Sequence, residues 1–116
     1  MKSEKPIDWR GSSLRDIKDD QIFTPNARRE AGHQLGQVQA GLDPDKWKPF
    51  NDVGAGAKEI IIDLDDGWFR VMYVAKFAEA IYVLHCFKKK TNATSKHDKE
   101  IATARFKAVI QERSQK

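Results

Sequence analysis

Residues 68–91, WFRVMYVAKFAEAIYVLHCFKKKT, are the part of the sequence that best indicates the fold. The stretch contains two apolar runs with the composition of strands, separated by a turn-like segment at residues 78–80. A third run of the same kind lies just before it, and Asp66-Gly67 marks a tight turn between the two. We therefore predict an antiparallel meander of three strands, over residues 58–64, 68–76 and 80–88.

Helix signals come before this meander. A short strand over residues 6–10 is followed by Gly11-Ser12-Ser13, which is typical of a turn and a helix N-cap. A clearer helix begins with Thr24 as its cap and ends at Gly41, for which Leu42 would be the apolar partner. The apolar face of this second helix consists of Ala27, Ala31, Leu35 and Val38.

The segments on either side of the meander differ in character. Residues 43–56 are rich in Asp, Pro and Gly and predict a loop, which Trp47 and Phe50 would hold against the core. After the meander, Ser95 and Asp98 have the spacing of a capping box and predict a final helix. The side chains of this helix expected to face the protein are Ile101, Ala102, Phe106, Val109 and Ile110.

Length and composition limit the chain to one domain. With 116 residues, 40% of them hydrophobic and 33% charged, it can close a single modest core. The order of elements predicts an α+β fold over residues 1–116. An antiparallel sheet, made of the N-terminal strand and the meander, would pack against two N-terminal helices, with a C-terminal helix added.

Cysteine usage and hydropathy indicate a cytoplasmic protein. Cys86 is the single cysteine, so it cannot form a disulfide within the chain, and a reducing compartment is the simpler expectation. The N-terminal sequence MKSEKPIDWR is charged, unlike a signal peptide. No run approaches the ~20 apolar residues that span a bilayer, so no membrane partner is expected.

Positive charge is concentrated near the C-terminus. Residues 1–87 carry 12 Lys or Arg against 14 Asp or Glu, whereas residues 88–116 carry 9 against 3. Such a concentration favours a polyanionic partner, because each neutralised phosphate releases counterions. An acidic protein could use the same field.

Alternation along the second meander strand separates core from candidate site. Phe69, Val71, Tyr73 and Ala75 share the face expected to lie under the helices. The other face carries Arg70 and Lys76, together with Trp68, Met72 and Val74. These two cations would project beside the lysine run, near enough to converge on one anion.

The residues that carry this pattern resemble a known family. FRVMYVAKFAEAIYVLHCFKKKTNATSK, preceded by RRE at residues 28–30, WKPF at 47–50 and KEI at 58–60, is similar to the phage-derived, HigB-like branch of the RelE superfamily of toxins. The resemblance covers roughly residues 6–113. It implies a ribosome-dependent endoribonuclease that cuts mRNA in the decoding site, with a HigA-like helix-turn-helix antitoxin as partner.

The resemblance also implies roles for individual residues. Arg70 matches the strand arginine that faces the scissile phosphate, and Lys88, Lys89 and Lys90 match the basic segment that follows the last strand. Lys58 and Glu59 lie where related toxins have lysines or a glutamate, so the general base could come from either residue. The tyrosine that many relatives place after the basic segment is missing, and Thr91, Thr94, Ser95 and Lys96 occupy that region instead.

A site of this kind can consist mostly of cations. Attack by the RNA's own 2′-hydroxyl requires a deprotonated nucleophile, a stabilised phosphorane and a protonated leaving oxygen. Arg70 could bind the phosphate oxygens in bidentate fashion, and a lysine, Glu59 or His85 could transfer protons. Neither a metal nor another cofactor is required. The expected RNA-binding residues are Lys58, Lys76, Lys88 and Lys96.

Each assignment has a structural alternative. Arg70 could be an exposed strand arginine paired with Asp63 or Glu59, and the lysine run a solvated loop. His85, which lies in an apolar strand, could be a buried and satisfied histidine. His33 and His97 have no partner at metal-ligand spacing. The whole chain could also be a non-catalytic, phage-derived module that binds nucleic acid or an acidic protein.

Overall fold

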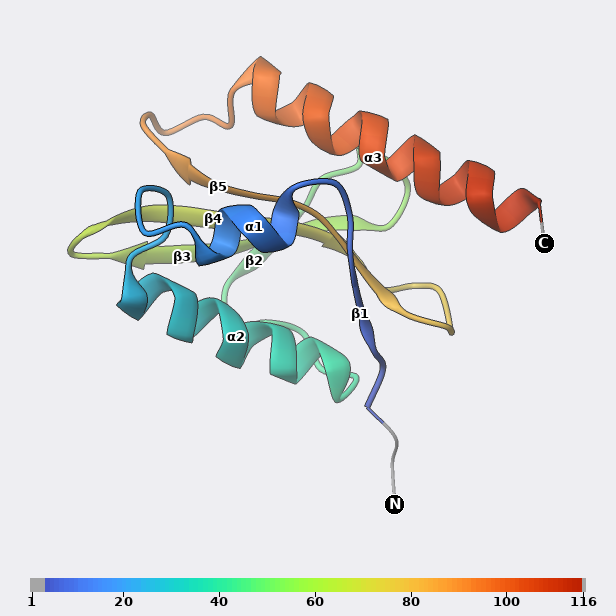
Figure 1. Cartoon of the computed structure of the whole chain (residues 1–116), viewed down its shortest axis with the longest axis horizontal. Coiled ribbons are helices and arrows are strands. Elements are labelled where there is room, and N and C mark those ends of the chain that lie inside the picture. The colour runs from blue at the N-terminus through green and yellow to red at the C-terminus, as the bar shows by residue number, and fades with distance from the viewer. Residues whose placement is uncertain (1–3, 116) are drawn as a thin grey trace.

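The structure, a computed structural model, describes residues 4–115 and confirms the α+β fold. A single sheet lies between two helical layers, with α1 and α2 on one side and α3 on the other (Figure 1). The elements in chain order are β1 (Ile7–Trp9), α1 (Ser13–Lys18), α2 (Pro25–Gln39), β2 (Trp47–Pro49), β3 (Ala57–Leu64), β4 (Gly67–Val74), β5 (Ile81–Lys89) and α3 (Lys96–Ser114). Within residues 4–115, no helix is long and apolar enough to cross a bilayer.

The sheet contains the predicted meander and two additions to it. Its strand order is β1-β5-β4-β3-β2, and β3, β4 and β5 pair antiparallel as predicted. β1 pairs in parallel with β5, so the sheet is mixed and not wholly antiparallel. β2 lies inside the segment predicted to be a loop and pairs antiparallel with β3. A strand of three residues has no measurable period, and Pro49 is tolerated there because β2 is an edge strand.

Both faces of the sheet are covered, although the sequence predicted one core. Phe69, Val71 and Tyr73 pack with α2 as predicted. Met72 and Val74, on the opposite face, form a second core with α3. The α3 residues in this core are Ala102, Phe106 and Val109.

Two residues predicted to pack against the protein are exposed. Ile110 was expected to face the protein, but it is 39% exposed, because the buried stripe of α3 runs through Phe106 and Val109. Gly41 ends α2 in the left-handed region with φ 88°, as predicted. Leu42, its expected apolar partner, is 62% exposed.

A bulge in β5 changes which side chains face α3. Met72 pairs with His85, whereas Tyr73 pairs with Val83, so Leu84 is left over on the β5 strand. Leu84 packs into the core under α3, and His85 also reaches α3 through Asp98. Beyond the bulge the alternation resumes with shifted phase. The bulge therefore determines which lysine at the end of β5 lies on the side of Arg70.

Candidate functional site

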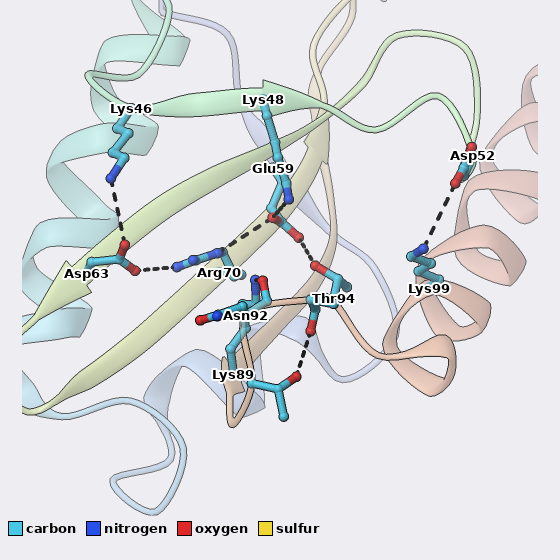
Figure 2. A network of polar contacts seen from close by, with 12 residues as sticks. Lys46, Lys48, Asp52, Glu59, Asp63, Arg70, Lys89, Asn92, Thr94 and Lys99 are labelled. Carbon is cyan, nitrogen blue, oxygen red and sulfur yellow. Dashed lines mark hydrogen bonds and ion pairs between the residues drawn. The ribbon is translucent and has the colours of Figure 1, made fainter.

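Arg70 and Glu59 form the centre of a buried charge cluster on the α3 side of the sheet (Figure 2). They stand on the neighbouring strands β4 and β3, with Arg70 Nε 3.6 Å from Glu59 Oε1. Arg70 Nη1 also donates to Asp63 Oδ1 at 2.7 Å and to the Phe69 carbonyl at 2.8 Å. The pairing considered as the alternative for Arg70 is thus present. The arginine itself, however, is only 7% exposed.

Glu59 has no exposed surface and is held by groups from three segments. Lys48 Nζ, from β2, lies 3.6 Å from Glu59 Oε1, beside the guanidinium of Arg70. Thr94, in the segment between β5 and α3, donates its hydroxyl to Glu59 Oε2 at 3.0 Å. A buried carboxylate needs such partners, because its desolvation is otherwise costly. Glu59 Oε1 and Arg70 Nε form an ion pair, but neither atom has a hydrogen-bond partner among residues 4–115.

Lys89 brings a second cation to this side of the sheet. It pairs with Trp68 across β4 and β5, is 8% exposed, and donates from Nζ to the Asn92 carbonyl at 2.6 Å (Figure 2). Burial lowers the pKa of Lys89, and the positive charge of Arg70 lowers it further, while Glu59 acts in the opposite direction. A lysine with a lowered pKa is suited to proton transfer nearer neutral pH.

The other lysines of the run are placed differently. Lys88 pairs with Phe69, and its Nζ lies 5.5 Å from the centre of that ring, on the face opposite Arg70. Lys90 follows the end of β5 and is exposed. All three lysines border a surface cavity of about 370 Å³, which Ser95 and Asp98 also line. Lys96 is exposed at the start of α3, 3.8 Å from Glu100.

Lys58 and Lys76 do not join the Arg70 cluster. Lys58 is next to Glu59 in β3 and therefore faces the other side, 3.0 Å from Asp43 and over the Trp47 ring at 4.4 Å. Lys76 lies past the end of β4, with its Nζ 5.2 Å from the centre of the Phe77 ring. Six residues of strand span about 20 Å, too far for the expected convergence with Arg70.

His85 is buried and tied to α3. Its Nε2 lies 2.8 Å from Asp98 Oδ1, and its ring stacks on Phe87 with centroids 4.8 Å apart. Burial lowers the pKa of His85, although Asp98 acts to raise it. The burial and the Nε2 contact agree with the structural alternative, whereas the buried Nδ1 has no hydrogen-bond partner among residues 4–115, so the ring is satisfied at one nitrogen only.

Sequence reasoning missed Lys48 and the role of Thr94. Lys48 fell in a predicted loop, and its signal would have been the alternation of Lys46, Trp47 and Lys48, which places both lysines on one side of a strand. Lys46 does reach this cluster, with Nζ 3.7 Å from Asp63 Oδ2. Thr94 was noted only as standing where relatives have a tyrosine. In the structure it holds Glu59.

The described part of the chain contains no metal-binding constellation of side chains. Among residues 4–115, no group of three or more His, Cys, Asp or Glu could hold an ion. Cys86 is free and buried, and burial raises the pKa of its thiol. A buried thiol of raised pKa is a poor nucleophile, and Cys86 lies in the core on the α2 side, away from Arg70, Glu59 and Lys89.

Comparison with known proteins places the chain in a family. A family model described as "Phage derived protein Gp49-like (DUF891)" matches residues 21–107, about three quarters of the chain. No curated protein matches the chain significantly. The matched residues include every side chain of the Arg70 cluster and all of β2 to β5. The phage-derived character inferred from the sequence is confirmed, and the chain belongs to the phage-derived Gp49-like family.

Proposed function

We propose that the chain is the toxin of a type II toxin–antitoxin pair and inhibits translation as a ribosome-dependent mRNA endoribonuclease. A HigA-like helix-turn-helix antitoxin would hold it in check. The phage-derived family and the resemblance to HigB-like toxins of the RelE superfamily support this proposal. The observation that carries it is the Arg70 guanidinium and the Lys89 ammonium on one side of the sheet, around the buried carboxylate of Glu59.

In this proposal the cations act on the phosphate at which the RNA is cut. Arg70 stabilises the charge that develops on the non-bridging oxygens during attack by the 2′-hydroxyl. Lys89, with its lowered pKa, is the best placed of the candidates for proton transfer. Glu59 is fully buried and paired, so its suggested part is to hold Arg70 and Lys48 in position. Lys90, which is exposed on the same segment, would bind the RNA backbone.

Growth of cells that express the chain without an antitoxin is the first test. Expression should stop growth, and the triple variant Arg70→Ala, Lys89→Ala, Lys90→Ala should relieve the arrest. A matched control removes three exposed cations elsewhere, with Arg15→Ala, Lys18→Ala and Lys107→Ala, and should remain toxic. Equal toxicity of the two triple variants would rule out the assigned site.

Cleavage must also be measured directly. Labelled mRNA incubated with the protein should be cut when translating ribosomes are present and stay intact when they are omitted. Attack by the 2′-hydroxyl leaves a 2′,3′-cyclic phosphate and a 5′-hydroxyl, so the ends of the fragments report the mechanism. Fragments with 5′-phosphate ends would contradict it.

A second candidate function has an observation in its favour. Arg70 and Lys89 already have internal partners in Asp63 and the Asn92 carbonyl, which suits a non-catalytic module that binds nucleic acid or an acidic protein. Both functions predict salt-sensitive RNA binding. They differ in the fate of the RNA: a folded, growth-inhibiting protein that leaves mRNA intact on ribosomes would favour the module.

A further inference from the structure

The chain has a second basic cavity, on the α2 side of the sheet. It measures about 270 Å³ and is lined by Lys5, Lys58 and Lys76 together with apolar residues in or just after α2 and β4. Lys58 and Lys76 were predicted to bind RNA, and Lys76 was expected to converge with Arg70. Lys58 lies across the sheet from Arg70, and Lys76 lies past the end of β4. We propose that this cavity binds an acidic segment of a partner protein, with a carboxylate at the lysines and an adjacent apolar side chain on the α2 wall.

The three lysines come from separate segments of the chain, and two of them, Lys5 and Lys58, are held in place by other lining residues or their neighbours. The ammonium group of Lys76 lies over the Phe77 ring at the border of the cavity. Lys58 pairs with Asp43 at 3.0 Å and covers the Trp47 ring. Lys5 donates from Nζ to the Ala75 carbonyl at 2.5 Å, while its backbone N–H donates to Gln39 at the end of α2. Figure 1 shows this N-terminal segment running past that end of α2. Cations that are already positioned lose less freedom when a ligand binds.

The charges around the cavity are unbalanced. Among its lining residues, which all lie in the described part of the chain, three lysines face one carboxylate, that of Asp43. Asp43 already forms an ion pair with Lys58, so the lining offers no further carboxylate to Lys5 and Lys76. The complement of this surface is a group of negative charge.

The apolar part of the lining selects the class of partner. Val38, Leu42 and Ala75 border the same cavity as the lysines. Leu42 is 62% exposed, more than the other large hydrophobic residues that reach the surface of the described chain. A nucleic-acid backbone would leave this leucine uncovered, because phosphates are met by cations and polar groups. A peptide that combines a carboxylate with an apolar side chain would cover both parts.

The site is also independent of the proposed cleavage. Lys58 and Glu59 are consecutive residues that point to opposite faces of β3, so the two surfaces are separated by the sheet. A partner at this cavity would leave the Arg70 cluster uncovered. The inference therefore holds whether or not the chain cuts RNA.

An NMR titration of the full-length, ¹⁵N-labelled chain tests the proposal. The probe is an acetylated and amidated peptide in which glutamate and leucine alternate. It should produce saturable shifts at the backbone amides of Leu42, Lys58 and Ala75. The same peptide with glutamine in place of glutamate should bind at least about tenfold more weakly, because each charge-assisted contact contributes roughly that factor.

Variants then assign the binding to the cavity. Lys58→Gln combined with Lys76→Gln should weaken the glutamate peptide at least about tenfold, whereas Lys18→Gln with Lys107→Gln should leave its affinity unchanged. Leu42→Ala removes an exposed side chain without threatening the fold and should also weaken the peptide.

Three results would overturn the proposal. The first is the absence of saturable shifts up to low millimolar peptide. The second is a set of shifts centred on Arg70 and Lys89. The third is inorganic phosphate that binds as tightly as the peptide while Leu42→Ala has no effect, which would make the cavity a simple anion site.

Discussion

Thr94 and Glu59 are 35 residues apart in the chain, yet the Thr94 hydroxyl donates a 3.0 Å hydrogen bond to the buried Oε2 of Glu59. The other oxygen of this carboxylate faces Lys48 and Arg70. Thr94 belongs to the segment that leaves β5 after the lysine run and leads into α3. A single side chain therefore connects the position of this segment to the charge cluster of the sheet.

Replacement of Thr94 by valine should destabilise the protein. Thr94→Val keeps the shape of the side chain and removes the donor, so one oxygen of a fully buried carboxylate loses its hydrogen bond. We expect a loss of about 1–3 kcal/mol in the free energy of unfolding, measured by urea denaturation. Thr91→Val, at an exposed threonine of the same segment, is the control and should cost much less. Equal stabilities of the two variants would show that the hydrogen bond contributes nothing.

Substitution of Lys89 should reduce toxicity, whereas substitution of the adjacent Lys88 should not. Lys89 lies beside Arg70, whereas Lys88 lies over Phe69 on the other face. Under the proposed function, Lys89→Ala should restore most of the growth lost on expression, and Lys88→Ala should restore none. Growth curves of induced cultures, with protein levels matched by immunoblot, measure this. If Lys88→Ala rescues growth as well as Lys89→Ala, the orientation of the run is not what determines activity.

The meander could be predicted from the sequence because its signal is local. Alternation along residues 68–76 separates Phe69 and Val71 from Arg70, and the structure confirms this separation. The direction of β1 could not be read in this way, since a lone strand has the same composition whether it pairs parallel or antiparallel. β2 is too short for a period, and it forms because β3 offers a free edge to residues 47–49.

The site was predictable in its centre and not in its surroundings. Arg70 and Glu59 followed from strand alternation and the family resemblance. The placement of Lys89 depends on the bulge at Leu84, which shifts the alternation of side chains along β5. The amino-acid composition of the strand does not predict such a bulge. Lys76 was misplaced because six residues of strand, about 20 Å, separate it from Arg70, and because β4 ends two residues earlier than the apolar pattern indicated. Burial of the cluster itself depends on α3, whose packing is a tertiary effect.

The pKa of Lys89 should lie below the ordinary value of a lysine side chain. Burial and the charge of Arg70 lower its pKa in the folded protein, while the unfolded chain keeps the ordinary value near 10.4. The unfolded chain thus binds the proton more tightly, and the stability of the fold should rise with pH between these two pKa values. NMR titration of the lysine side chains measures the shift. Arg70→Gln should raise the pKa of Lys89. The control Arg15→Gln, which replaces a solvent-exposed arginine, should leave that pKa unchanged.

The contact of Glu79 with Arg113 should make stability depend on pH in the acidic range. Arg113 donates to both carboxylate oxygens of Glu79, at 2.6 and 3.2 Å, and Tyr82 donates to it at 2.8 Å, so the turn after β4 is joined to the end of α3. The Arg113 hydrogen bonds, followed by that of Tyr82, lower the pKa of Glu79 to about 2. Because this pKa lies below the unfolded value of about 4.3, the stabilisation is complete above that value and is lost as the pH falls towards about 2. Denaturant titrations between these pH values should show a flatter profile for Glu79→Gln than for the unaltered chain, and Arg113→Gln should behave alike. If both variants keep the full slope, another carboxylate is responsible for it.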